Sequence, residues 1–172
     1  MPEVDRRGSG WRGGLFLLIG ACVVALDQIT KLWVRLNLAP YETVPIFGRL
    51  SLTNVRNTGS AFGLFQNQAF LLTLIAIVGI VAILLFYRYF SKANLLGIFA
   101  LGLVFGGAIG NLIDRLRFGY VTDFIDVRLW GDFHWPTFNV ADSGITVGSI
   151  MLIIFIFLTF RKTDGSSSKA GS

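Results

Sequence analysis

Little charge, one cysteine and one histidine are the main deficits of this sequence. Charged residues make up 15% of its 172 residues, whereas an ordinary soluble domain contains about 25%. The single cysteine, Cys22, excludes an internal disulfide, and one cysteine with one histidine cannot form a zinc site of thiolate and imidazole ligands. No basic stretch is interleaved with aromatic residues, as nucleic-acid-binding segments usually are. We therefore expect no metal, no other cofactor and no nucleic-acid partner.

Long apolar runs stand in place of charge, and 53% of the residues are hydrophobic. A helix needs about 20 residues to cross the hydrocarbon layer of a membrane. Four runs approach that length, and they lie at about 13–36, 69–87, 93–113 and 142–160. No small-residue cleavage site follows the first run, which favours a retained signal anchor over a cleaved signal peptide. We predict a membrane protein of the all-α class, with residues 1–172 forming a single integral membrane domain of four transmembrane helices.

The polar segments between these runs suggest how the chain sits in the membrane. Four spans place both termini on one side, and the distribution of lysine and arginine favours the cytoplasmic side for them. Segments 39–65 and 115–139 then lie outside, and alternating residues around Arg49–Val55 predict short strands on the membrane surface. The net charge of +5 indicates contact with phospholipid headgroups. The Gly- and Ser-rich tail, 164–172, is predicted to be disordered.

Three glycines form a stripe in the third run. Gly102, Gly106 and Gly110 stand four residues apart, so one face of a helix would be nearly bare backbone. Helices associate in lipid through close packing, and small residues permit it. The stripe therefore predicts a tight contact with a neighbouring helix.

Asp123 lies in a segment, 121–129, whose alternate residues are apolar. If this segment is extended, Asp123 falls on the apolar face, where an unpaired carboxylate is costly. Asp126 falls on the opposite face and is interpreted as an ordinary solvated charge. Two hypotheses stay open for Asp123: a buried ion pair with Arg115 or Arg117, and a functional carboxylate held in an apolar setting.

Asp142 opens the fourth run. Asn139 or Asp142 could simply cap the N-terminus of that helix, where negative charge is favoured. If Asp142 meets Asp123, however, the two carboxylates cannot both ionise easily and would share one proton. One would then draw a proton from water while the other donates to a carbonyl oxygen, which hydrolyses an amide without a metal. The two aspartates are therefore a candidate catalytic pair.

Two further polar clusters lie at helix ends. Asn111, Asp114 and Arg115 share one helix face, and Arg115 could hold a carboxylate or a lipid phosphate. A surface ion pair between Asp114 and Arg115 is the alternative. Asp27 and Lys31 stand one turn apart at the end of the first run, in the orientation that stabilises a helix.

Five blocks of sequence, taken in order, resemble the bacterial lipoprotein signal peptidases, also called signal peptidase II. The resemblance covers residues 12 to 162, and its third and fifth blocks are the most specific. The blocks are DQITK from position 27, RNTGSAF from position 56, GGAIGNLIDR from position 106, VTDFI from position 121 and FNVADS from position 138.

The resemblance implies an aspartic endopeptidase of the bacterial inner membrane, with cytoplasmic termini, four transmembrane helices, a small extracytoplasmic β-cradle and a loop near the site. Such an enzyme removes the signal peptide from diacylglyceryl-modified prolipoproteins, cleaving N-terminal to the lipidated cysteine. Its partners would be these substrates and membrane phospholipid, with no obligate protein partner. The resemblance assigns catalysis to Asp123 and Asp142, substrate binding to Asn57, Asn111, Arg115 and Asn139, and structural support to Asp27, Lys31, Asp114 and Gly110.

Two other classes of protein compete with a peptidase. A proton-coupled transporter would also place carboxylates in the membrane, but near the middle of broken helices. A non-enzymatic assembly factor would account for the glycine stripe and would leave Asp123 unexplained.

Overall fold

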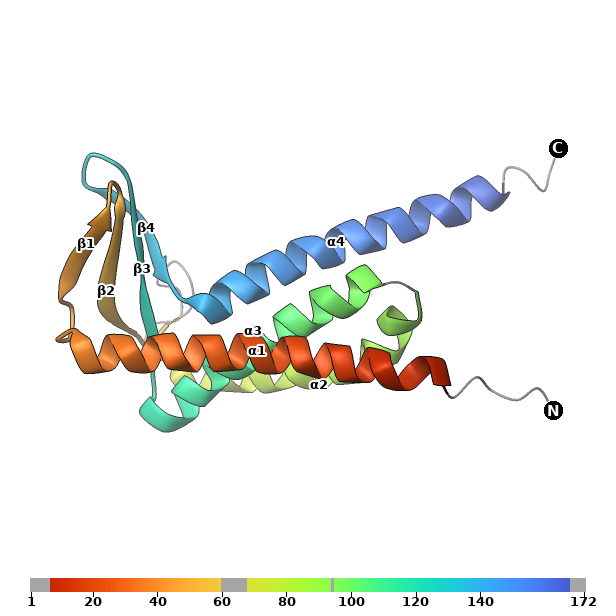
Figure 1. Cartoon of the computed structure of the whole chain (residues 1–172), viewed down its shortest axis with the longest axis horizontal. Helices are drawn as coiled ribbons and strands as arrows, with labels where there is room; N and C mark the ends of the chain where they lie inside the picture. Colours follow the sequence, from red (N-terminus) through yellow and green to blue (C-terminus); the bar gives the residue numbers. More distant parts are fainter. Residues whose placement is uncertain (1–6, 60–67, 94, 168–172) are drawn as a thin grey trace.

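The computed structural model describes residues 7–59, 68–93 and 95–167, in which four long helices stand beside a small sheet (Figure 1). Each helix is long and apolar enough to span a membrane, in agreement with the predicted class of four transmembrane helices. The start of α1 and the end of α4 lie at one end of the helices, and the sheet lies at the other, called the sheet end below. The helices are α1 (Arg7–Asn37), α2 (Ala69–Ala93), α3 (Leu95–Phe118) and α4 (Val140–Ser167).

Two helices extend beyond their predicted ends. α3 continues to Phe118 instead of ending near residue 113, because its last turn carries arginines, which are favoured at a helix C-terminus. α4 continues to Ser167, so its last turn includes the first residues of the tail that was predicted from residue 164. Each residue added to an existing helix gains one backbone hydrogen bond, so a long span can carry a short polar extension. Residues 168–172 lie outside the described residues.

The predicted short strands are present and form one antiparallel sheet in the order β1-β2-β3-β4. β2 pairs with β3 although α2 and α3 separate the two strands in sequence, and Val55 lies opposite Asp123. The pairing brings Asn57 beside the first residues of β3. The rest of the predicted outer segment, 60–65, lies outside the described residues. The strands are β1 (Thr43–Phe47), β2 (Leu50–Asn57), β3 (Val121–Trp130) and β4 (Phe133–Phe138).

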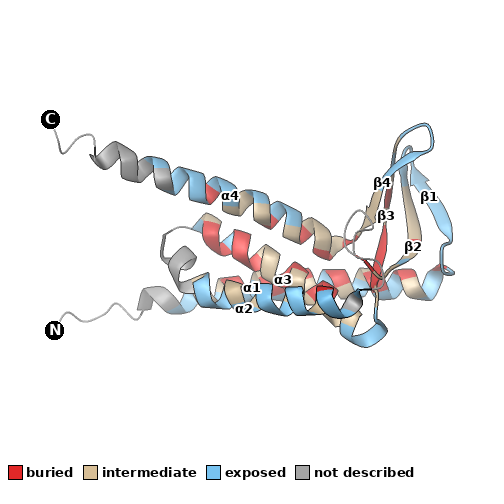
Figure 2. Ribbon diagram, turned by 180° about the vertical axis from the view of Figure 1, so that it is seen from behind, coloured by how far each residue is buried: buried red, intermediate tan, exposed pale blue. Residues whose placement is uncertain are grey.

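Small residues let α3 pack closely against two helices, as the glycine stripe predicts. A Cβ added at Gly106 would lie 2.6 Å from the backbone oxygen of Gly20 on α1. A Cβ added to Gly107, on another side of α3, would collide with the backbone of Ala141 on α4. Figure 2 shows buried residues along α3, while α2 is mostly exposed or half-buried. α3 is therefore the central helix, and its sheet end is held between α1 and α4.

An apolar cluster fixes the sheet on the end of α1. Val34 and Leu38 of α1 pack with Phe124 of β3, and all three side chains are buried. Because side chains alternate along a strand, Phe124 on α1 directs the adjacent Asp123 to the opposite face. The fold thereby places one carboxylate next to the first turn of α4.

Candidate active site

The start of β3 is buried on both faces. Residues from Val121 to Phe124 are all buried, because α1 covers one face and the other lies against the cavity described below. The alternation predicted for this strand holds for Asp123, which is 2% exposed. The prediction for Asp126 is wrong, since it is 8% exposed and its carboxylate lies 2.7 Å from the Nδ1 atom of His134 on β4. A partner on the neighbouring strand makes that burial tolerable.

Two asparagine side chains hold the Asp123 carboxyl. Asn57 donates to its Oδ2 over 2.8 Å, and Asn139 donates to its Oδ1 over 2.6 Å. Among the described residues, no arginine or lysine forms an ion pair with Asp123. The hypothesis of a buried ion pair with Arg115 or Arg117 is therefore wrong. Asp123 is satisfied by neutral donors, which do not cancel its charge.

The surroundings of Asp123 disfavour its charged form. Burial is the main cause and the nearby Asp142 carboxylate is the second, and together they raise the pKa of Asp123 to about 7. The hydrogen bonds from Asn57 and Asn139 oppose that shift. A pKa near neutrality lets this carboxyl exchange a proton under ordinary conditions, as a group in acid–base catalysis must.

Asp142 and Asn139 cap the first turn of α4 reciprocally. The Asn139 side-chain oxygen accepts from the backbone N–H of Asp142 over 2.9 Å, and the Asp142 Oδ2 accepts from the backbone N–H of Asn139 over 3.2 Å. This is a capping box with an aspartate at its third position. Asn139 also donates to Asp123, so the residue that caps the helix joins the two carboxylates. The capping hypothesis is confirmed for both residues, and it is compatible with a catalytic pair.

Asn111 faces Asp142 in one orientation because of Lys31. A lysine ammonium can only donate, and the Lys31 Nζ lies 3.0 Å from the Oδ1 of Asn111. The Nδ2 of Asn111 must then point the other way, where it donates to Asp142 Oδ1 over 2.8 Å. Asn139 donates to the same Oδ1 of Asn111 over 3.2 Å, which reinforces that orientation.

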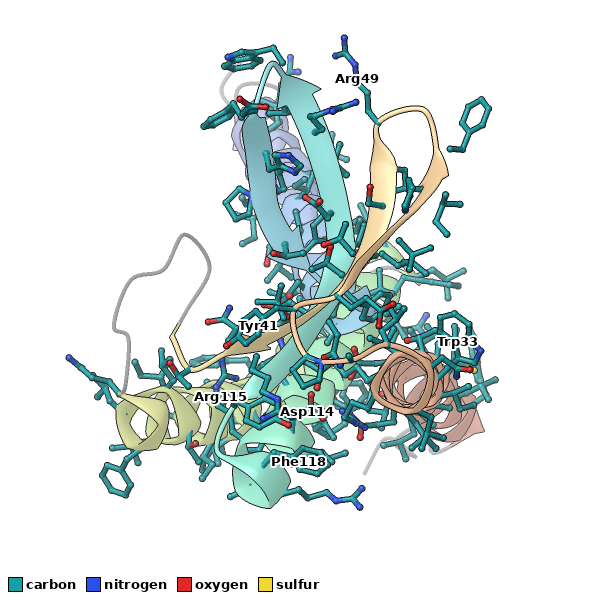
Figure 3. The ribbon with its side chains drawn as sticks, turned by 90° about the vertical axis from the view of Figure 1, so that its left-hand side faces the viewer. Trp33, Tyr41, Arg49, Asp114, Arg115 and Phe118 are labelled. Atoms are coloured by element: carbon teal, nitrogen blue, oxygen red, sulfur yellow. The ribbon has the colours of Figure 1, made fainter. Side chains whose placement is uncertain are left out.

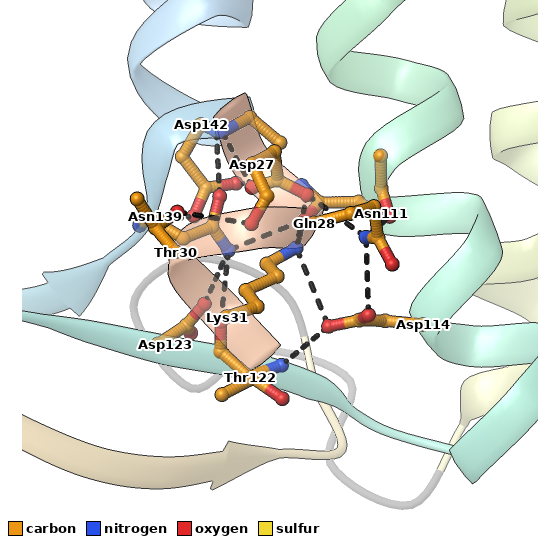
Figure 4. A network of polar contacts seen from close by, with 12 residues as sticks. Asp27, Gln28, Thr30, Lys31, Asn111, Asp114, Thr122, Asp123, Asn139 and Asp142 are labelled. Carbon is orange, nitrogen blue, oxygen red and sulfur yellow. Dashed lines mark hydrogen bonds and ion pairs between the residues drawn. The ribbon is translucent and has the colours of Figure 1, made fainter. Parts of the chain in front are cut away.

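Lys31 is itself fully buried between two aspartates (Figure 4). Its Nζ lies 2.9 Å from Asp27 and 3.3 Å from Asp114, so the predicted pair of Asp27 and Lys31 is confirmed. The other oxygen of Asp27 accepts from the backbone N–H of Ala141, in the first turn of α4, over 3.0 Å. A Cβ on Gly110 would lie 2.6 Å from Asp27 Oδ2, so glycine is needed for this approach.

The charges of the cluster nearly balance. Its acidic members are Asp27, Asp114, Asp123 and Asp142, and its basic members are Lys31, Arg35 and Arg115. Four carboxylates against three cations leave one negative charge when every group is ionised. One proton held by the pair of Asp123 and Asp142 makes the cluster neutral, which is the state that a poorly solvated site favours.

A cavity of about 470 Å³ opens beside the two aspartates. Asp123, Asp142, Asn57 and Arg115 line it. The ion pairs of Asp114 are with Lys31 and Arg35, so the predicted surface pair between Asp114 and Arg115 is wrong. The remaining wall is largely apolar and includes Trp135, Pro136, Phe138, Ile145 and Val147. Among the described residues, no three His, Cys, Asp or Glu side chains lie close enough together to hold a metal ion.

The structure adds three residues to the cluster that sequence reasoning did not include. Gln28 donates to Asp27, to Asp114 and to the backbone oxygen of Gly110. Arg35 contacts Asp114 and donates to Thr122 over 2.9 Å, and the backbone N–H of Thr122 donates to Asp114. Arg35 stands one helical turn after Lys31, and that spacing was a signal that could have included it.

Several known proteins are similar to this chain in sequence or in structure. The sequence model described as signal peptidase (SPase) II matches residues 19–158. A lipoprotein signal peptidase of Syntrophotalea carbinolica is 46% identical over 144 residues, which cover 81% of this chain and 89% of that protein. One of Moorella thermoacetica is 44% identical over 138 residues, with coverages of 80% and 89%. A solved bacterial membrane enzyme aligns with a TM-score of 0.77 at 33% identity, covering 84% of this chain and 88% of its own.

Proposed function

The chain belongs to the signal peptidase II family, and from that premise we propose that Asp123 and Asp142 together activate the water that cleaves its substrate. Family membership makes the protein a membrane peptidase that removes signal peptides from prolipoproteins. The observation that carries the mechanism is that Asn139 contacts both aspartates while both line one cavity. Two carboxylates in one poorly hydrated space share a proton, and a shared proton supplies an acid and a base together.

The two aspartates take different roles in the proposed step. Asp142 lies in the first turn of α4 and accepts two hydrogen bonds, and a helix N-terminus favours negative charge. Asp142 is therefore the base that takes a proton from water. Asp123, with a pKa near 7, is the acid that donates its proton to the oxygen of the scissile carbonyl. The hydroxide adds to the carbonyl carbon and gives a tetrahedral intermediate with two hydroxyl groups. The carbon–nitrogen bond then breaks as Asp142 returns its proton to the leaving amine, and Asp123 takes a proton back from one of the hydroxyls as the new carbonyl forms.

The cavity suits a substrate that is partly apolar. Its aromatic and aliphatic wall would accept a signal helix and an acyl chain. Arg115 lines the same space without an ion pair to a described carboxylate, so its guanidinium can hold a substrate carbonyl or the glyceryl linkage. The proposed cleavage is N-terminal to a diacylglyceryl-modified cysteine. Asn57 lines the cavity and contacts the peptide as it enters, whereas Asn111 and Asn139, which are buried, act on the substrate through the aspartates that they orient.

The proposed orientation places both termini in the cytoplasm and the sheet end outside. Three of the basic residues at the sheet end belong to the charged cluster of the site, namely Lys31, Arg35 and Arg115. Their position follows from the site, so we leave them out of the comparison of basic residues on the two sides of the membrane. The remaining basic residues are then more frequent near the termini, as the rule for cytoplasmic loops requires. The position of Asp123 in the sheet and of Asp142 at a helix start argues against the transporter alternative, which needs carboxylates near the membrane centre.

Cleavage of a lipidated precursor by purified variants in detergent tests the mechanism. We expect Asp123→Asn and Asp142→Asn each to lower kcat by at least about 10²–10⁴-fold, since each removes one proton-transfer group. Asp126→Asn is the matched control, because Asp126 lies on the same strand but bonds to His134 and does not line the cavity. Thermal unfolding of each variant shows whether its fold is intact. Normal turnover by either of the first two variants contradicts the paired mechanism.

A chelator distinguishes this mechanism from a metal-dependent one. The same assay is repeated after dialysis against a strong chelator, with the untreated enzyme as the control. Unchanged turnover is expected, because water activation is assigned to the two carboxylates. Loss of turnover that returns on addition of a divalent cation would contradict the proposal.

A further inference from the structure

Three arginines gather around two stacked aromatic rings at the sheet end of α3. The rings of Phe118 and Tyr120 stack with their centroids 5.8 Å apart. The guanidinium carbons of Arg35 and Arg117 lie 4.7 and 5.3 Å from the centroid of Phe118, and that of Arg56 lies 5.3 Å from the centroid of Tyr120. These five residues, called the arginine–aromatic stack below, come from α1, β2, the end of α3 and the turn that follows it.

Two of the three guanidinium groups have no acidic counterpart in the part of the chain that the structure describes. Arg35 is committed to Asp114 and Thr122. Arg56 and Arg117 are exposed, and no carboxylate of the described residues lies within ion-pair distance of either. The stack therefore holds, at the sheet end of the helices, two positive charges that no described carboxylate compensates.

The stack lies apart from the catalytic cavity. None of its five residues lines that cavity. Arg56 lies opposite Thr122 in the β2–β3 ladder, whereas the next residue, Asn57, reaches Asp123. Because side chains alternate along a strand, Arg56 and Asn57 point to opposite faces. Figure 3, which is viewed from the sheet end, shows Phe118 at one margin of the molecule and Arg49 at the opposite margin.

A guanidinium placed over an aromatic ring keeps N–H donors for a further partner. The ring attracts the charge of the group, while the N–H donors lie in the guanidinium plane and fit the oxygens of a phosphate in a forked arrangement. Aromatic side chains are favoured at the headgroup level of a membrane, which is the depth expected for the end of a spanning helix. We propose that the arginine–aromatic stack binds the phosphodiester headgroup of an anionic phospholipid in the leaflet at the sheet end.

Lipid binding at the stack would brace the end of α3. Phe118 and Tyr120 flank the turn that leads from α3 into β3, the strand that carries Asp123. A bound phosphate between Arg56 and Arg117 would join β2 to the end of α3. The site needs these two elements in a fixed relative position, because they carry Asn57 and Arg115. The binding itself does not depend on the peptidase mechanism.

The test measures thermal unfolding in maltoside micelles, which contain no phosphate. The full chain is titrated with short-chain phosphatidylglycerol, and in parallel with phosphatidylcholine of the same chain length and with inorganic phosphate. The variants are R56Q with R117Q, and the matched control is R49Q with R128Q, which removes the same charge from the distant tip of the sheet. For the unaltered protein we expect phosphatidylglycerol to raise Tm by about 5 °C at saturation.

The control should keep that rise in Tm, and the R56Q and R117Q protein should lose most of it. Equal rises in the two proteins would overturn the proposal. A full rise with inorganic phosphate would show a site for a free anion, and a full rise with phosphatidylcholine would show that the acyl chains alone act; either result overturns the assignment to an anionic lipid. If the double variant does not fold, R117Q alone, on an exposed side chain, gives the same readout, and an unchanged rise in it counts against the proposal.

Discussion

α2 and α3 are neighbouring helices with opposite relations to their surroundings. The spanning part of α2 has a mean hydropathy of 2.9, and only 6% of its residues are buried within the protein. The corresponding part of α3 has a lower mean hydropathy, 2.0, yet 50% of its residues are buried. In a protein dissolved in water, the more apolar helix would be the more buried one. Here the order is reversed.

The reversal follows from lipid being the solvent. Lipid tails are as apolar as leucine, so an apolar side chain gains little by moving from lipid into the protein. Glycine seams and polar side chains gain more, because close packing and hydrogen bonds are available only inside. α3 contributes Gly106, Gly107, Asn111 and Asp114 to the interior. In this protein, small and charged residues therefore indicate which helix faces lie in the interior.

The strongest test of that contrast changes a buried charge. Lys31→Met should lower the free energy of unfolding by about 3–5 kcal/mol, because Asp27 would lose its cation and Asp114 would keep only Arg35. Ile29→Met on the same helix is the matched control, since Ile29 is 64% exposed toward the surroundings, and its expected change is near zero. Equilibrium unfolding in mixed detergent measures both. Equal stability of the two variants would mean that the buried cation is not needed.

A smaller effect is expected when one methyl group is added to each helix. Gly106→Ala on α3 should destabilise by about 1–3 kcal/mol, since the new Cβ would meet the backbone of Gly20 and force the helices apart. Gly79→Ala on α2 has no atom within 4 Å of its Cβ and should be neutral or stabilising by up to about 1 kcal/mol, because alanine favours helix. Thermal unfolding of the two proteins is the measurement. A loss of stability in both variants would contradict the conclusion that Gly106 faces the interior of the protein and Gly79 faces lipid.

The interior should also give the protein a pH dependence near neutrality. The pKa of Asp123 is raised to about 7 in the folded state, above the ordinary carboxyl value that it has when unfolded. Its bound proton stabilises the fold fully at pH values below that ordinary value, and the stabilisation is lost as the pH rises through about 7. Between pH 6 and pH 8 the free energy of unfolding should fall by about 1.4 kcal/mol from this group alone.

Asp123→Asn isolates that contribution, because the variant cannot ionise at this position. Its unfolding should change less between pH 6 and pH 8 than that of the unaltered protein, whatever its absolute stability. Asp132→Asn, at an exposed position between β3 and β4, serves as the control and should keep the full pH dependence. A pH dependence of equal size in Asp123→Asn would show that another group titrates in this range.

Much of this architecture follows from sequence because its determinants are local. The four spans are visible as runs of apolar residues, and the stripe of Gly102, Gly106 and Gly110 predicts close packing. The strand alternation that sets Asp123 on an inward face is also local. The ion pair of Asp27 and Lys31 needs only helical spacing.

The partners across the bundle could not be read from sequence. Burial of Asp126 depends on His134, eight residues away on the next strand, and on a register that contains irregularities. Asp114 pairs with Lys31 and Arg35 of another helix instead of its neighbour Arg115. A buried carboxylate needs a cation within the interior, and α1 supplies two there. Such choices depend on which helices face each other. Spacing within one helix shows which residues share a face, as Lys31 and Arg35 do, but it does not identify the helix that this face contacts.

The contact of Asp126 with His134 predicts the smallest effect of the series. The two side chains are 12% and 45% exposed, in a hairpin that projects beyond the helices, so water screens their interaction. His134→Gln should therefore lower the free energy of unfolding by no more than about 1 kcal/mol, since the carboxylate that loses its partner stays partly hydrated. Chemical unfolding of His134→Gln beside Lys31→Met measures the difference. The same loss in both variants would contradict this explanation. It would mean that a polar contact is equally costly to remove in the exposed hairpin and in the buried interior to which α3, unlike α2, contributes.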